Sequence, residues 1–173
     1  MTRSWTLAAV ALPALAMVGC GNSSSTPTLP PRALVKLTFP EPIVAVPSTD
    51  SGFAMEASVP MVASETAGVN AYPYQMRVET TAEATGVTNY AKFVVTESVE
   101  KIPAGGSVEI PFRVYLSSMG PHRAKVLLDT TDASTPVGVP TGSAAAALEV
   151  LWGTVPTGER GQWSGEFRIL PPQ

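Results

Sequence analysis

The sequence is poor in the residues that most often carry chemistry or cross-link a chain. Its 173 residues include one cysteine, Cys20, and one histidine, His122. A single cysteine excludes an internal disulfide, so the folded part must be stabilised by packing. A single histidine leaves histidine-based metal clusters and histidine-paired nucleophiles without their parts, and the sequence has no G-x-S-x-G elbow. We therefore expect no catalytic residue, no metal site, no cofactor and no enzymatic activity.

Charge is also scarce, and the sequence has no basic cluster. Charged residues make up 14% of the chain, against the ~25% that is usual for soluble domains. The formal net charge is −3, and removal of the first nineteen residues would leave 10 basic and 14 acidic side chains, a net charge of −4. A mildly acidic chain of this kind lacks the electrostatic footprint of a nucleic-acid-binding protein. Nucleic acid is therefore not an expected partner.

No apolar run reaches the length that a membrane-spanning helix needs. The N-terminus carries an uncharged, mostly apolar stretch from Trp5 to Gly19, preceded by Arg3. A spanning helix needs about 20 apolar residues, whereas a basic start, a short apolar centre and small residues at its end are typical of an export signal. Ordinary signal peptidase would cut after Ala16 and would leave Cys20 as a free thiol.

A second cleavage site fits the cysteine better. Met17-Val18-Gly19-Cys20 resembles the lipobox of bacterial lipoproteins, with Met17 in place of the usual leucine. The resemblance implies cleavage before Cys20, diacylglycerol with palmitate-type chains on its sulfur, and a third acyl chain on its new amine. A thioether is inert where an exposed thiol is reactive, and each buried CH₂ contributes about 0.8 kcal/mol to anchoring. We therefore expect residues 1–19 to be a lipoprotein signal peptide and Cys20 to be the lipidation site.

The segment after the cysteine is polar and proline-rich. Residues 20–32 contain three consecutive serines and end in Pro30-Pro31-Arg32, a composition too polar to fold. We expect a lipid-anchored disordered tether that reaches roughly 30 Å. Lipoproteins retained in the inner membrane of Gram-negative bacteria commonly carry an aspartate directly after the cysteine. Gly21 and Asn22 differ from that signal, so the resemblance favours the outer membrane, with the protein facing the periplasm or the cell surface.

From residue 33 onward the apolar residues alternate, as in half-buried strands. The clearest case is Val108–Leu116, in which every even-numbered residue is apolar. Pro111, on the outward face, predicts an edge strand or a bulge because proline cannot donate to a ladder. The other predicted strands are Val35–Phe39, Tyr72–Glu79, Ala91–Val95, Arg123–Asp129, Leu148–Trp152 and Trp163–Ile169. The alternation is less clear in Ile43–Val46 and Phe53–Val62, which could add strands. We predict an all-β domain over residues 33–171, an immunoglobulin-like antiparallel β-sandwich of about 7–8 strands.

Two stretches bear on that fold. Ile102–Asp132 is similar to the closing half of bacterial immunoglobulin-like modules of the abnormal-spindle-like and choice-of-anchor kind. This resemblance implies a fold and carries no activity with it. In Ser143–Gly153, the alanines and the N-terminal serine would suit a helix, whereas Leu148–Trp152 is β-like. The all-strand context favours a strand there.

The remaining titratable candidates have plain structural interpretations. His122 follows a Gly-Pro turn and is expected at the surface or at a corner rather than in a binding site. Asp129 and Asp132 could contribute to a Ca²⁺ site, but nothing nearby completes a shell of six to eight oxygens, so acidic caps of a turn are favoured. Glu97 and Glu100 could be a glycosidase pair, but they fit a solvated strand end better.

Aromatic residues and long loops are the other candidates for binding. Most aromatics fall on inward faces, and we expect only Tyr90 and Tyr115 to face outward, too few for a sugar-stacking platform. Two aperiodic segments, residues 131–143 and 153–162, are rich in glycine, proline and threonine. Loops of this length are often the functional ones, so contact with a ligand or partner is expected there first.

Together these patterns predict a lipid-anchored cell-envelope protein with a non-enzymatic module. We expect the immunoglobulin-like domain to bind an envelope protein in adhesion or assembly, with the membrane as a second partner through Cys20. One alternative is a lipoprotein that binds a carbohydrate or another small ligand, and a second, disfavoured, is an enzyme. The sequence leaves the partner, the oligomeric state and the membrane leaflet open.

Overall fold

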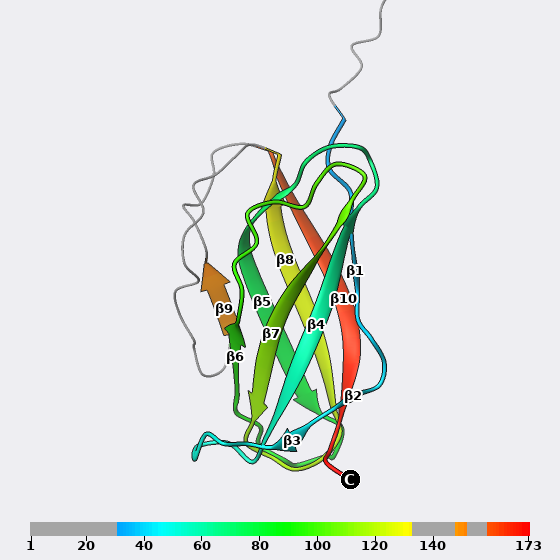
Figure 1. Ribbon diagram of the computed structural model, residues 1–173. Helices are drawn as coiled ribbons and strands as arrows, with labels where there is room; N and C mark the ends of the chain where they lie inside the picture. Colours follow the sequence, from blue (N-terminus) through cyan, green and yellow to red (C-terminus); the bar gives the residue numbers. More distant parts are fainter. Residues whose placement is uncertain (1–30, 133–147, 152–158) are drawn as a thin grey trace, which may run out of the picture. The chain divides into compact units, whose positions relative to one another are not determined.

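The described part of the chain forms a sandwich of two β-sheets. The computed structural model describes residues 31–132, 148–151 and 159–173, and within these ranges the regular secondary structure is entirely strand. The chain divides after Pro30, and the sandwich belongs to the unit Pro31–Gln173. Figure 1 shows the two sheets packed face to face. The all-β fold class predicted from the alternation is confirmed.

Each sheet has five strands. The first sheet contains β1 (Val35–Thr38), β3 (Val46–Pro47), β4 (Met55–Glu65), β6 (Ala91–Val95) and β7 (Ser107–Leu116). The second contains β2 (Ile43–Val44), β5 (Tyr72–Ala82), β8 (His122–Thr131), β9 (Leu148–Leu151) and β10 (Arg160–Leu170). The described residues thus hold more strands than the 7–8 expected, because the chain before β4 is broken into three short strands.

The strand order is that of an immunoglobulin-like sandwich. The first sheet runs β1-β4-β7-β6, with β3 also paired to β4, and the second runs β2-β10-β8-β5-β9. Consecutive long strands, such as β4 and β5 or β7 and β8, lie in opposite sheets, as Greek-key connections require. The described pairs are antiparallel except that β2 runs parallel to β10, with Ile43 opposite Ile169. This exception arises because the chain crosses from the first sheet to the second and back between β1 and β3.

The core lies between the inward faces of the two sheets. Phe93 of β6 and Phe112 of β7 meet edge to face at 6.2 Å, and Phe112 also meets Phe167 of β10 at 6.2 Å. These rings join the first sheet to the second. The large side chains with under 2% exposure include Phe93, Phe112, Met55, Met61, Met76, Ile110, Leu116, Leu128 and Ile169. Each contributes roughly 1.5–3 kcal/mol when fully buried.

Pro111 lies in a central strand, so the prediction of an edge strand or bulge is wrong. β7 pairs with β4 in regular register, with Pro111 opposite Pro60. The Pro111 carbonyl accepts a hydrogen bond of 3.0 Å from the backbone N–H of Thr96, on the side away from β4. Because N and C=O of one strand residue point to the same side, the Pro111 nitrogen also points away from β4. The β4–β7 ladder therefore loses no donor at this pair.

The ambiguous segment Ser143–Gly153 is a strand where it is described. Leu148–Leu151 forms β9 and pairs antiparallel with β5, with Leu151 opposite Gln75. The strand prediction is confirmed for these four residues. The rest of the segment lies outside the described residues.

Candidate functional site

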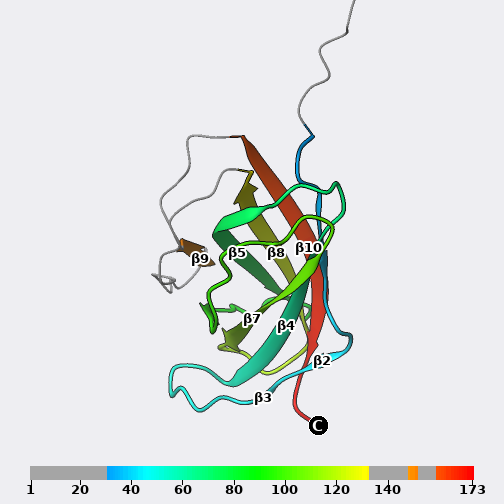
Figure 2. The same cartoon turned by 45° about the horizontal axis from the view of Figure 1, so that its top comes forward.

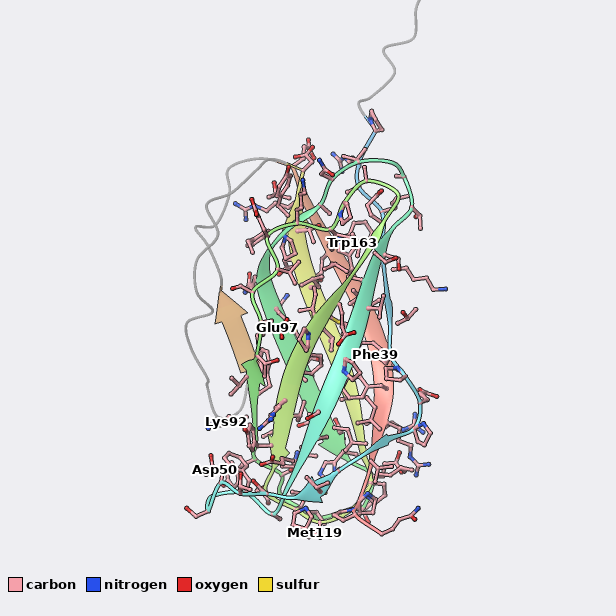
Figure 3. The ribbon with its side chains drawn as sticks, viewed as in Figure 1. Phe39, Asp50, Lys92, Glu97, Met119 and Trp163 are labelled. Atoms are coloured by element: carbon pink, nitrogen blue, oxygen red, sulfur yellow. The ribbon has the colours of Figure 1, made fainter. Side chains whose placement is uncertain are left out.

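A pocket of about 240 Å³ opens at the end of the sandwich where the chain enters β1. Its lining comes from three segments: residues 32–34 before β1, Thr130–Asp132 at the end of β8, and Glu159–Gly161 with Trp163 at the start of β10. Figure 3 labels Trp163 toward this end of the sheets. The pocket therefore lies where the described ends of the two predicted loops, 131–143 and 153–162, meet the sandwich.

Trp163 is the aromatic side chain of the pocket. Its indole N–H donates a hydrogen bond of 2.8 Å to Oγ1 of Thr130, which fixes the orientation of the ring. Gly161, two residues earlier on the same face of β10, has no side chain, and a Cβ there would lie 2.6 Å from Cζ2 of Trp163. The indole therefore occupies space that any other residue at position 161 would fill. A half-buried ring beside a buried hydroxyl can pack against an apolar or a sugar ring.

The rim of the pocket carries charges of both signs. Arg32 and Glu159 form an ion pair in which both side chains are more than half exposed. Such an exposed pair contributes only about 0–1 kcal/mol, so it can open for a ligand at little cost. Leu34 is 53% exposed and adds an apolar side chain, and Asp132 adds a carboxylate. The rim can thus meet a polar, uncharged or zwitterionic molecule.

The pocket wall at Leu34 is fixed by Glu65, the last residue of β4. Glu65 is 2% exposed, and its carboxylate accepts five backbone N–H hydrogen bonds of 2.7–3.2 Å. The donors lie in three separate segments, at Leu34, at Ala67–Val69 and at Gly105. One carboxylate thus joins the entry of the chain, the β4–β5 connection and the β6–β7 connection.

The electrostatics of Glu65 follow from those contacts. Burial alone would raise the pKa of its carboxyl group, but the backbone hydrogen bonds, first from Gly105 and Leu34, lower that pKa to about 2. The sequence analysis missed this residue, although a signal was present. Alternation in β4 places Met61, Ala63 and Glu65 on the inward face, and a carboxylate at an inward position is an exception that needs partners.

Asp129 belongs to a second polar cluster, on the outer face of the second sheet. Its carboxylate accepts a hydrogen bond of 2.8 Å from Nε2 of Gln162 and lies 3.7 Å from a terminal nitrogen of Arg77. Burial raises the pKa of the nearby Tyr74 hydroxyl, and the negative charge of Asp129 acts in the same direction. Asp129 therefore ties β10 to β8 and β5 through its side chain.

The predicted acidic pairs have different outcomes. Asp129 lies within β8, so its interpretation as the cap of a turn is wrong. Asp132 follows β8 directly and lines the pocket, and the two carboxylates are not brought to one site. Glu97 and Glu100 are both exposed just after β6, which confirms the solvated strand end; Figure 3 labels Glu97. Within residues 31–132 and 159–173, no three potential metal ligands gather.

His122 lies at the β7–β8 corner, one of the two places expected for it, but it is buried rather than exposed at the surface. It is the first residue of β8 and is fully buried. Nδ1 donates to the carbonyl of Gly120 at 2.8 Å, and Nε2 lies 3.0 Å from Oγ of Ser118. Burial lowers the pKa of the imidazole, so Nε2 of the neutral ring accepts from Ser118. The preceding Gly120-Pro121 pair suggested a turn, whereas His122 already occupies the first inward position of β8.

The two aromatics expected to face outward differ in what they contact. Tyr115 is half-buried and packs on Phe53, with ring centroids 5.7 Å apart. Nζ of Lys92 lies 5.0 Å from the Tyr115 ring centre and 3.1 Å from Oδ2 of Asp50, and Figure 3 shows Lys92 and Asp50 at one end of the sheets. The Tyr115 face is therefore covered by the protein's own lysine, whereas Tyr90 is 60% exposed.

Cys20, the predicted lipidation site, lies outside the described residues, as do the predicted signal peptide and most of the predicted tether. In the part of the chain that the structure describes, no helix has the length and apolar character to span a membrane. No protein-family model and no curated protein matches this chain.

Proposed function

We propose that this chain is a lipid-anchored protein of the bacterial cell envelope whose immunoglobulin-like domain binds another protein and catalyses no reaction. The lipobox-like sequence Met17–Cys20 supports the anchor, and the polar residues 20–32 supply the tether. The sandwich starts almost directly after that tether, at Val35. The domain is held at the membrane by acyl chains on Cys20 and faces the periplasm or the cell surface, with the outer membrane favoured.

The observation that carries the binding role is the use of buried polar groups as internal ties. Glu65 joins three connecting segments, His122 holds the β7–β8 corner, and Asp129 joins neighbouring strands. Groups that act on a substrate instead face a cleft that the substrate enters. Loop ends ordered in advance favour recognition, because less conformational entropy is lost when a partner binds.

Intact-mass measurement of the membrane-extracted protein tests the anchor. The expected mature chain begins at Cys20 and carries two or three acyl chains, and Cys20→Ala is expected to abolish both processing and lipidation. Separation of inner from outer membranes on a density gradient tests the expected location. An unmodified mature chain that begins at Met17 would contradict the anchor.

Crosslinking in intact cells, before extraction, tests the binding role. The expected result is one predominant heterologous adduct with an envelope protein. The matched control keeps residues 1–32 of this chain and replaces the sandwich by an unrelated domain, so that anchoring is unchanged. Adducts that are the same for the chain and its control would show that the sandwich does not select a partner.

A second function, binding of a small polar ligand, is favoured by the pocket at Trp163. A volume of about 240 Å³ lined by an indole, two threonines and charges of both signs suits a molecule the size of one sugar ring. Calorimetric titration with monosaccharides tests it. Binding that is lost in Trp163→Ala and kept in Tyr115→Ala would establish this function, and the absence of binding to any sugar would remove it.

A further inference from the structure

Two connections lie at the end of the sandwich opposite the pocket. Residues 83–90 join β5 to β6, and residues 117–121 join β7 to β8. Figures 1 and 2 both show these connections at the lower end, away from the start of β1. The register agrees, because Ala82 at the end of β5 lies opposite His122 and Ala91 at the start of β6 lies opposite Leu116.

The exposed apolar side chains gather at this end. The two connections expose Val87 (44%), Tyr90 (60%) and Met119 (61%), which we call the distal surface. Of the seven large exposed hydrophobics in the described residues, five lie in segments of this end: Val44, Val46, Val87, Tyr90 and Met119. Single exposed apolar residues are normal on a soluble domain, but their concentration at one end is typical of an interaction site.

Hydrogen bonds hold the two connections of the distal surface together. The backbone N–H of Tyr90 donates to Oγ of Ser117 at 2.7 Å, and the N–H of Ser117 donates back to the Tyr90 carbonyl at 2.9 Å. The N–H of Glu83 donates to the Pro121 carbonyl at 2.9 Å. The fully buried His122 anchors the base of the β7–β8 connection. The distal surface is therefore ordered before any partner arrives.

The charged groups near the distal surface are already paired within the domain. Glu83 pairs with both Arg123 and Arg168, and Lys92 pairs with Asp50. An anionic lipid or a nucleic acid is attracted by a cluster of unpaired basic side chains. Each of these three basic side chains has a carboxylate partner within the domain, although Arg123 and Arg168 share one, Glu83. Tyrosine and methionine are enriched in the cores of protein–protein interfaces. The chemistry therefore favours an apolar patch of a protein as the occupant.

We propose that the distal surface docks onto an apolar patch of a second, different protein of the cell envelope. This inference rests on the proposed binding function and names the surface that performs it. The chain outside the sandwich leaves it at Pro31, beside the pocket. An anchor on that segment holds the domain by its opposite end, so the distal surface is free to meet a partner.

Site-specific photocrosslinking in the full-length, membrane-bound protein tests the proposal. p-Benzoylphenylalanine is introduced in place of Val87 or Met119, and in a matched control in place of Leu34, which is similarly exposed at the pocket end. A discrete heterologous adduct is expected from the first two positions and not from the third. Binding of the identified partner, once purified, is expected to weaken at least tenfold in Tyr90→Ser with Met119→Ser and to change little in 500 mM salt.

Each other outcome has a defined meaning. An adduct with a second copy of this chain or with lipid, equal adducts from Leu34, or no adduct from either distal position would overturn the docking proposal. Fractionation and intact mass of the same samples report on the anchor separately. A lipidated protein without a distal adduct leaves the anchor intact, whereas a distal adduct on an unlipidated protein refutes the anchor and retains the docking surface. Unchanged circular dichroism of the variants excludes misfolding.

Discussion

The two ends of the sandwich are built from different chemistry. The pocket end is held by a buried carboxylate, Glu65, and presents an indole with charges of both signs. The distal end is held by backbone hydrogen bonds and a neutral imidazole, His122, and presents apolar side chains. The buried carboxylate makes the first end sensitive to acid, whereas the recognition proposed for the second end depends on apolar area. The comparison predicts that changes at one end leave the other end intact.

The largest expected effect comes from removing the charge at the pocket end. Glu65→Gln places an amide N–H₂ against backbone N–H groups that now donate to a carboxylate, so the free energy of unfolding is expected to fall by about 2–3 kcal/mol. Urea unfolding at pH 7 measures it. Glu109→Gln, at an exposed position of β7, is the matched control and is expected to change stability by less than about 0.5 kcal/mol. Equal losses in both variants would contradict the role of Glu65.

The same carboxylate predicts the response to acid. Its pKa in the folded protein, about 2, lies below the usual 4.5, so its stabilising contribution is complete above pH 4.5 and is lost as the pH falls toward 2. The unfolding free energy of the wild type should therefore fall over this interval more steeply than that of Glu65→Gln. Parallel curves for the two proteins would show that other groups cause the acid sensitivity.

A smaller effect is expected from filling the space beside the indole. Gly161→Ala puts a Cβ 2.6 Å from the Trp163 ring, and overpacking of this kind costs roughly 1–3 kcal/mol. The tryptophan emission should shift as the ring moves. Gly52→Ala is the control, because a Cβ there has its nearest neighbour, Oδ1 of Asp50, at 3.7 Å. Crosslinking from the distal surface should persist in Gly161→Ala. Its loss would show that the two ends are coupled.

The distal end should show a weaker response to pH, in a higher interval. The pKa of His122 is lowered by burial, so the unfolded chain takes up its proton first and stability falls as the pH drops below about 6.5. The hydrogen bond to the Gly120 carbonyl and the negative charge of Glu83 both act in the opposite direction on this pKa. We expect the unfolding free energy of the wild type to fall between pH 7.5 and 5.5, and to fall less in His122→Gln. A His122→Gln protein with the same slope would assign the loss to another group.

The smallest stability effect is predicted for the distal surface itself. Met119→Ser removes a side chain that is 61% exposed, so the unfolding free energy should stay within about 0.5 kcal/mol of the wild type. Adduct formation from Val87 should nevertheless fall severalfold. A large loss of stability would place Met119 in the core rather than in an interface.

The strands could be predicted from the sequence because alternation is local. In Val108–Leu116 the even-numbered residues are inward, as expected. The interpretation of Pro111 failed for a non-local reason: whether a proline costs a hydrogen bond depends on the register against β4, which the segment does not encode. The breaking of the chain before β4 into short strands depends in the same way on which sheet each piece meets.

The polar sites were predictable only in part. Glu65 and His122 stand at inward positions of alternating strands, so the sequence marks them as exceptions. Two of the donors to Glu65 lie 31 residues before it and 40 after it, at Leu34 and Gly105, and only the topology brings them to the carboxylate. The two long loops indicated where the pocket lies. That Arg32 also lines the pocket does not follow from any pattern in the sequence, because Arg32 is far from both loops along the chain. The anchor at Cys20 stays a prediction.

The crossing of β1, β2 and β3 between the sheets has a mechanical consequence. β1 runs from the pocket end toward the distal end and pairs with β4 at four positions, and β2 then pairs with β10 in the other sheet. Tension applied at Pro31 by the proposed anchor and opposed by a load on the distal end would pull β1 along its own length. Its ladder bonds would then be sheared together rather than peeled one after another, so the first strand can act as a clamp that resists being drawn out under load.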